Sequence, residues 1–241
     1  MLLRRVSEHV KKQDWLAVAV DFLIVVIGVF MGLQVQEWNQ QRIDRNKEHV
    51  YLERLTTDFS VIERGLQRCL AVYKDSIEAI NLVSQVVENQ VTSDSTPITD
   101  DNTFATALIR MTAGDIPAGR SAAFVEMLST GDLSILRDAT LRNALTAYDE
   151  RAQINREIWR SIREEIGAYG QPLYDNVKLN IDLDETRISS ISDYDLTAMS
   201  RDPGFRSMLN VLAGTKSNIY ELCLAQLDRV DKVQQALKEQ P

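Results

Sequence analysis

One stretch decides the fold of this chain: residues 15–33, with the sequence WLAVAVDFLIVVIGVFMGL. It contains a single charged residue, Asp21. Because a helix rises about 1.5 Å per residue, the stretch extends roughly 28 Å, close to the thickness of the hydrocarbon core of a bilayer. Trp15 and Trp38 flank it, as expected for rings that prefer the interfacial layers. The sequence therefore predicts a transmembrane helix over residues 15–36.

The residues after this stretch do not form a cleavage site of the kind that ends a signal peptide. Such a site has small residues at alternate positions, whereas residues 32–38 are GLQVQEW. We therefore expect an uncleaved membrane anchor. The alternative, a buried helix of a soluble protein, is less consistent with the two flanking tryptophans.

One face of the predicted anchor combines its glycines with its only charge. At 100° per residue, six residues fall within about 80° of one another. They are Ala17, Asp21, Ile24, Gly28, Gly32 and Val35. The GxxxG pair, Gly28 and Gly32, lets two helix backbones approach closely, so we expect this face to pack on another transmembrane helix, in a homo-oligomer or a membrane complex. In a second interpretation, Asp21 only extends toward the cytoplasmic interface.

The charge of the chain is divided unevenly. Residues 1–14 carry a net charge of +2, whereas the rest of the chain apart from Asp21 carries −9. An acidic protein of net charge −8 lacks the basic surface that nucleic acids require, so we expect no nucleic-acid partner. Four basic residues precede the apolar stretch and three follow it closely, so the positive-inside rule favours a cytoplasmic N-terminus only weakly.

Beyond the anchor, apolar residues recur at spacings of three and four, which is the spacing of one helix face. This pattern predicts three long helices. The first continues from the anchor to near Asn89, and the second extends from Asp138 to Tyr169. The third begins at Asp202, with Pro203 in its first turn, and ends close to the C-terminus. Amphipathic helices of this length bury their apolar faces against one another in an antiparallel bundle.

Shorter elements connect these helices. Residues 103–112 and 121–129 fit two short helices, the first capped by Asp101 or Asn102 and the second by Ser121. Gly131 fits the left-handed residue that ends a helix. Residues 177–183 alternate apolar and polar side chains, as one isolated strand would. The expected fold is all-α: one N-terminal transmembrane helix continuing into an antiparallel helical bundle, with at most a small strand element near 177–183.

Two motifs of the chain resemble those of a bacterial family. Residues 25–39, VVIGVFMGLQVQEWN, match the membrane exit VVIGV-x-x-G-LQ-x-x-x-WN, and residues 129–143, STGDLSILRDATLRN, match a later segment, with Thr130 where the family often has Ser. The chain thus resembles an uncharacterised family of bacterial single-pass membrane proteins. The resemblance implies a cytoplasmic head at residues 1–14, an inner-membrane helix at 15–36 and a periplasmic helical domain at 37–241. It implies no activity.

Residues typical of catalysis are sparse. The two histidines, His9 and His49, lie on opposite sides of the predicted anchor and cannot share a site. The sequence lacks GxxxxGK[ST], GxGxxG, HExxH, GxSxG and CxxC, which are typical of nucleotide, zinc, serine-hydrolase and thiol chemistry. We therefore expect no enzyme activity, no catalytic residue and no cofactor.

One acidic run invites a calcium interpretation, because hard cations bind several carboxylate oxygens. Its members are Asp182, Asp184, Glu185, Asp193 and Asp195. An EF-hand loop starting at the first of them would have Arg187 where a glycine is needed. It would also have Asp193 where a bidentate glutamate belongs. We therefore expect a solvated acidic loop and no metal site.

The only two cysteines, Cys69 and Cys223, lie on the first and the third long helix. If the domain is periplasmic, they can form a disulfide that ties the two helices together. Both also occupy apolar positions, where a free cysteine behaves as a small core residue. Both interpretations stay open on the sequence.

These observations favour a membrane-anchored, non-catalytic interaction protein, an accessory or structural subunit of a larger inner-membrane complex. The alternative is an extracytoplasmic ligand-sensing module. We expect no signalling module, because only 14 residues precede the anchor and no second apolar stretch follows it. A sensor of this kind would have to signal through a partner protein.

Overall fold

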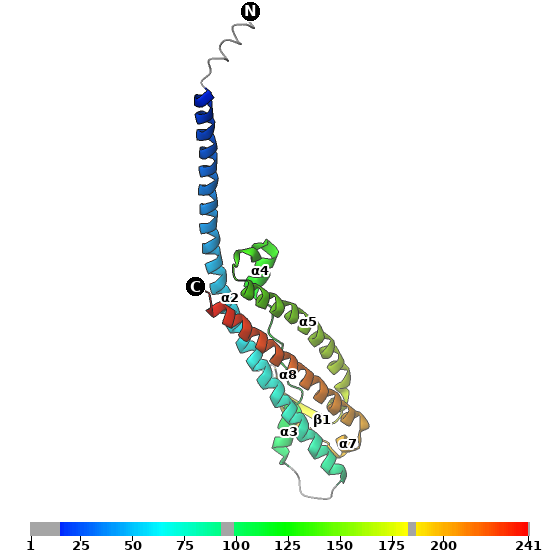
Figure 1. Ribbon diagram of the computed structural model, residues 1–241. Coiled ribbons are helices and arrows are strands. Elements are labelled where there is room, and N and C mark those ends of the chain that lie inside the picture. Colours follow the sequence, from blue (N-terminus) through cyan, green and yellow to red (C-terminus); the bar gives the residue numbers. More distant parts are fainter. Residues whose placement is uncertain (1–14, 93–98, 183–186, 241) are drawn as a thin grey trace, which may run out of the picture. The chain divides into compact units, whose positions relative to one another are not determined.

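The structure is a computed structural model that describes residues 15–92, 99–182 and 187–240 (Figure 1). The contacts divide the chain into two units, Met1–Tyr51 and Leu52–Pro241. The first long helix, α2 (Trp15–Thr92), contributes residues to both units. The predicted cytoplasmic head, residues 1–14, lies outside the described residues.

The first unit contains the apolar part of α2. Within the part of the chain that the structure describes, α2 is the one helix with a segment long and apolar enough to cross a membrane, and none of that segment is buried. Residues 15–36, which the sequence predicts to be helical, all lie within α2. Its large exposed apolar side chains are Val20, Phe22, Leu23, Ile24, Val25, Ile27, Val29, Phe30, Met31, Leu33 and Val35.

The second unit is built on three long helices: α2 from Leu52 onward, α5 (Ala139–Tyr169) and α8 (Pro203–Lys238). Side-chain contacts show their directions. Glu63 of α2 accepts a hydrogen bond of 2.7 Å from Gln234 of α8, and further along α2 Cys69 contacts Cys223. Residue numbers thus rise on one helix as they fall on the other, so α8 is antiparallel to α2.

The second long helix, α5, has the same direction as α2. Phe59 of α2 packs edge-on against Tyr148 of α5, with 4.9 Å between ring centroids, and Tyr73 contacts Trp159 further along both helices. Gln226 of α8 donates to the backbone oxygen of Tyr148 at 3.1 Å. The bundle is therefore all-α, as predicted, and α8 is antiparallel to both α2 and α5. These two helices are parallel to each other because residues 99–138 return the chain to the end of the unit where α2 enters it.

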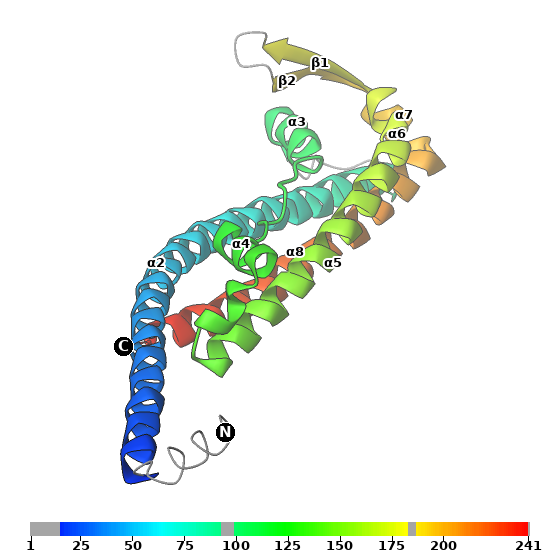
Figure 2. The same cartoon turned by 90° about the horizontal axis from the view of Figure 1, so that it is seen from above.

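The returning segment contains the two predicted short helices, α3 (Asp101–Arg110) and α4 (Ala122–Thr130), followed by the short 3-10 helix η1 (Asp132–Ile135). Figure 1 shows α3 and α4 toward opposite ends of the unit, and Figure 2 shows the same two helices from above. The prediction of Asp101 or Asn102 as the first cap was wrong. Asp100 is the cap, because its carboxylate accepts from the backbone nitrogen of Thr103 at 3.0 Å.

The other predicted helix ends are confirmed. The hydroxyl of Ser121 accepts from the nitrogen of Phe124, and Gly131 has a φ of 78°, in the left-handed region that glycine adopts without strain. Asp138 and Asp202 cap α5 and α8 through their carboxylates.

The expected single strand has a partner. Strand β1 (Val177–Asp182) pairs antiparallel with β2 (Arg187–Tyr194), in a register that joins Val177 to Tyr194. The register shifts twice, once between Lys178 and Leu179. The short helices α6 (Gln171–Tyr174) and α7 (Leu196–Arg201) flank this hairpin. Tyr194 attaches β2 to α3, because its ring lies 5.0 Å from that of Phe104.

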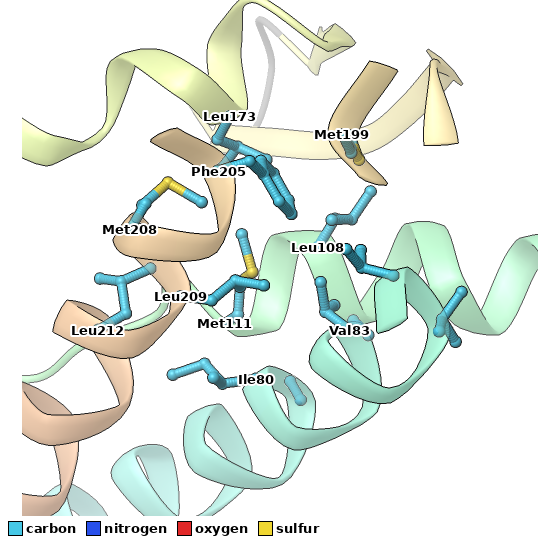
Figure 3. Packing of buried hydrophobic residues seen from close by; sticks show 14 of the residues in the cluster. Ile80, Val83, Leu108, Met111, Leu173, Met199, Phe205, Met208, Leu209 and Leu212 are labelled. Carbon is cyan, nitrogen blue, oxygen red and sulfur yellow. The ribbon is translucent and has the colours of Figure 1, made fainter. Parts of the chain in front are cut away.

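The hairpin end of the unit encloses a hydrophobic cluster (Figure 3). Every helix of that end contributes residues to it. The short elements are therefore stabilised by the burial of apolar surface, which contributes a free energy of about 25 cal/mol per Å². Its labelled members are Ile80, Val83, Leu108, Met111, Leu173, Met199, Phe205, Met208, Leu209 and Leu212.

Candidate functional site

The described part of the predicted helix-packing face of α2, at Ile24, Gly28 and Gly32, has no neighbour within its unit. A Cβ atom added at Gly28 or Gly32 would meet nothing within 4 Å, and the Ile24 side chain is exposed. Trp38, one of the two predicted interface anchors, is 66% exposed. The side chains of Trp15, Ala17 and Asp21 lie outside the described residues.

The structure brings the two cysteines together. The sulfurs of Cys69 and Cys223 lie 2.7 Å apart, although the residues are 154 positions apart in the sequence, and both side chains are buried. The contact with Cys223 and burial both raise the pKa of the Cys69 thiol. The pair is thus a contact between α2 and α8, and its oxidation stays a prediction.

Residues 111–121, here called the tethered segment, connect α3 to α4 and are held by side chains of the long helices. From α2, Ser76 donates to the backbone oxygen of Met111 at 2.9 Å, and the Tyr73 hydroxyl donates to that of Asp115 at 2.9 Å. From α5, the Tyr148 hydroxyl donates to the backbone oxygen of Gly119 at 2.8 Å. Because helix packing fixes the positions of these donors, their hydrogen bonds hold the backbone of the segment in a single conformation.

Ion pairs fix both halves of the tethered segment. Arg68 of α2 pairs with the Asp115 carboxylate at 2.7 Å. Arg120 makes a two-pronged bond with Asp149 of α5, at 2.5 and 2.8 Å. Asp149 is 3% exposed, so this pair is screened far less by water than a surface pair.

A buried lysine completes this tethering. Lys216 of α8 is 2% exposed, and its Nζ donates to the backbone oxygens of Ala113 and Thr112 at 2.5 and 3.4 Å. The Nζ also lies 5.3 Å from the centre of the Tyr73 ring. No carboxylate among the described residues pairs with it, and burial lowers its pKa to about 8. A Cβ at Gly114 would lie only 3.3 Å from the Tyr73 hydroxyl oxygen and 3.6 Å from this Nζ, so the Tyr73 hydroxyl leaves little room for a side chain there.

A cleft of about 330 Å³ opens beside the tethered segment. Its walls are residues 116–119 of that segment and one face of α5 with Ala152, Arg156, Trp159 and Arg160. A Cβ at Gly119 would lie 3.5 Å from Nη2 of Arg156, so the guanidinium extends over the segment. The cleft thus combines apolar walls with arginine side chains.

A much smaller compartment of about 10 Å³ adjoins the cleft and shares Pro117, Ala118, Ala152 and Trp159 with it. Asn155 and Gln226 also line the compartment. They are 5% and 2% exposed, and no donor among the described residues reaches their side-chain oxygens, Oδ1 and Oε1. Buried acceptors without a donor are rare in folded proteins.

The acidic run does not form a metal site in the part of the chain that the structure describes. Asp193 pairs with Lys178 at 2.7 Å, and Asp195 caps α7 by accepting from the nitrogen of Ala198 at 2.8 Å. Asp184 and Glu185 lie outside the described residues, as does the side chain of Asp182. Across residues 15–92, 99–182 and 187–240, no cluster of three potential metal ligands occurs.

No known protein-family model matches the chain, and no curated protein or solved structure is significantly similar to it. A functional assignment therefore depends on the chain's own residues.

The sequence did not indicate Lys216, Asn155 or Gln226 as site residues. Lys216 lies on the apolar face of α8 between Leu212 and Ile219, at a position where the sequence pattern favours an apolar residue. Asn155 lies among the apolar residues of the α5 face, where a single polar residue more often fixes helix register than binds a ligand. A polar residue at an apolar helix position was the one available clue for all three.

Proposed function

We propose that this chain is a membrane-anchored, non-catalytic interaction protein of the bacterial inner membrane. One observation carries the proposal: the apolar segment of α2 is entirely unburied. Leaving a large apolar side chain in water instead of an apolar medium costs about 1.5–3 kcal/mol, and this segment exposes many of them. A lipid bilayer removes that cost, so the bilayer is the first partner of the chain.

The second partner in this proposal is another transmembrane helix. The open space around Gly28 and Gly32 supports it, because a glycine pair four residues apart lets a neighbouring backbone pack closely. An accessory or structural subunit uses such a face to join a larger membrane complex. The helical unit, Leu52–Pro241, then faces the rest of that complex in the periplasm.

Gly32→Ile should reduce crosslinking of the anchor to its partner helix by more than about twofold, because a bulky side chain separates the two backbones. Insertion should persist, since the substitution adds apolar surface. Photo-crosslinking from a probe at Ile24, in membranes, measures the yield. Phe30→Ile is the matched control, because Phe30 lies about 160° around the helix from Gly28. An unchanged yield for Gly32→Ile would remove the glycine face from the proposal.

The proposed orientation has its own test. A C-terminal alkaline phosphatase fusion should be active, because that reporter folds only after export. A C-terminal green fluorescent protein fusion exported by the general secretion route should be dark. The opposite pair of results would place the helical unit in the cytoplasm.

The subunit proposal is tested by extraction in mild detergent and identification of the proteins that co-purify with the tagged chain. A defined set of partners that is reduced by Gly32→Ile and kept by Phe30→Ile supports it. A chain that elutes alone under the same conditions contradicts it.

The cleft beside the tethered segment supports a second candidate, a ligand-sensing module that signals through a partner. In that case a bound small molecule would change the contacts of residues 116–119. Tyr73 of α2 and Tyr148 of α5 fix this stretch through hydrogen bonds to the backbone oxygens of Asp115 and Gly119. Ligand-dependent change in the set of co-purified proteins would separate it from a purely structural subunit.

A further inference from the structure

Two arginines, Arg156 and Arg160, determine the charge of the cleft on α5. Arg160 is neutralised by Glu157, with 2.7 Å between Nη1 and Oε2. Arg156 has neither an ion pair nor a side-chain hydrogen bond among the described residues, although its guanidinium extends over Gly119. One uncompensated guanidinium at the cleft favours a ligand with a single negative charge. A carboxylate fits best, because a guanidinium binds both of its oxygens with two parallel hydrogen bonds.

The walls of the cleft are apolar and partly aromatic. Trp159 lines both the cleft and the adjoining compartment, and Pro117 and Ala118 line the side opposite α5. The guanidinium of Arg163 lies 5.6 Å from the centre of the Trp159 ring, which limits the movement of the indole. A volume of about 330 Å³ with such walls suits a small ligand with a flat or short apolar body.

The compartment behind these walls requires a hydrogen-bond donor. Asn155 Oδ1 and Gln226 Oε1 are both buried, and neither accepts a hydrogen bond from the part of the chain that the structure describes. The Nε2 of Gln226 donates to the backbone oxygen of Tyr148 at 3.1 Å, and this hydrogen bond fixes which end of the side-chain amide is Oε1. Leaving such an acceptor unsatisfied costs about 1–3 kcal/mol.

The volume of the compartment, about 10 Å³, is enough for roughly one water molecule. A water that donates to both oxygens presents only its lone pairs to the cleft. A ligand that meets either this water or the two oxygens directly must therefore donate a hydrogen bond itself.

We propose that this cleft binds a small organic monocarboxylate that also carries a hydroxyl or ammonium donor. The carboxylate pairs with Arg156, the body of the ligand packs against Trp159 and Pro117, and the donor is directed at Asn155 and Gln226. Every residue of the site belongs to the helical unit, so binding does not depend on the proposed membrane attachment.

The test uses the full chain in mild detergent and isothermal titration calorimetry. The probes are para-hydroxybenzoate and lactate, which carry both groups, benzoate, which lacks the donor, and para-hydroxybenzyl alcohol, which lacks the carboxylate. At least one of the first two should bind, and about tenfold more tightly than the probes that lack a group. If neither binds at about 5 mM, the site is not one for this class of ligand.

Two substitutions locate the binding. Arg156→Gln should weaken it about tenfold or more, whereas Arg151→Gln, on the same helix and outside the cleft, should not. Equal losses in both variants would mean non-specific attraction of the anion and would overturn the proposal.

Asn155→Leu keeps the branched shape of the side chain and replaces its amide oxygen and nitrogen by methyl groups, which removes the acceptor. It should abolish the preference for para-hydroxybenzoate over benzoate and leave the binding of benzoate in place. If the preference survives in a folded Asn155→Leu protein, as judged by circular dichroism, the donor is not recognised in the compartment. Because Arg156 is exposed, its substitution tests the proposal even if Asn155→Leu does not fold.

Discussion

Formation of a disulfide between Cys69 and Cys223 should raise the free energy of unfolding of the helical unit by about 4 kcal/mol. The two sulfurs already contact one another, and 154 positions separate the residues in the sequence. A cross-link over so long a loop removes much of the conformational entropy of the unfolded chain. It would also join α2 to α8 covalently at the centre of the unit. An oxidising periplasm, as proposed, favours this bond.

Urea unfolding of the purified chain with and without reductant measures the effect. Replacing Trp15 and Trp38 by phenylalanine leaves Trp159 as the only tryptophan, so its fluorescence reports on the helical unit alone. The Cys69→Ala/Cys223→Ala protein is the control, because its stability should not respond to reductant.

The redox state in cells is tested separately. Chain isolated from membranes and denatured in the presence of a maleimide should have no free thiol if the bridge has formed. Two reactive thiols would mean that the pair is a reduced core contact, and would also count against a periplasmic location.

The helices of this chain were predictable from the sequence because their signals are local. Apolar residues at spacings of three and four mark one helix face, and Ser121, Asp138 and Asp202 each cap the helix that follows them. The one wrong cap, Asp101 or Asn102, has the same chemistry as the correct Asp100 and lies one or two positions away. Adjacent cap-forming residues cannot be ranked without the backbone.

The second strand of the hairpin was missed because its apolar residues do not alternate. Ile188 and Ile191 are three positions apart in β2, and the register shifts twice along the pair. A bulge inserts an extra residue and breaks the two-residue period that marks a strand. Its closing residue, Tyr194, is held by packing on Phe104, which lies 90 positions earlier.

The candidate site was not predictable because its parts are distant in the sequence. The cleft combines residues 116–119 with one face of α5, and the compartment adds Gln226 from α8. The sequence allowed a contact between the two cysteines but did not decide it, because both also occupy apolar positions where a free cysteine packs as a core residue. Lys216 lies on a helix that the sequence predicted correctly, yet its burial depends on the tethered segment that covers it.

Raising the pH from about 7 to about 9.5 should stabilise the helical unit by about 2 kcal/mol through Lys216. Burial lowers the pKa of this amine from its usual 10.5 to about 8. Between these two values the unfolded chain holds a proton that the folded chain has released. The unfolded state then binds more protons, so the free energy of unfolding rises with pH. Below the lower value both states are protonated and the full cost of burying the charge is present.

Other titrating groups near Lys216 must be separated from its effect on the pH dependence of the free energy of unfolding. Burial raises the pKa of Tyr73, so its hydroxyl lowers stability only when the pH exceeds about 10, outside the window. The two thiols are removed as titrating groups by working in the Cys69→Ala/Cys223→Ala protein. Urea unfolding across the pH series should show the rise in this protein and in Lys232→Met, an exposed lysine of α8, but not in Lys216→Met. A rise of the same size in Lys216→Met would assign the slope to another group, and Lys216 would then be charged in the folded chain throughout the window.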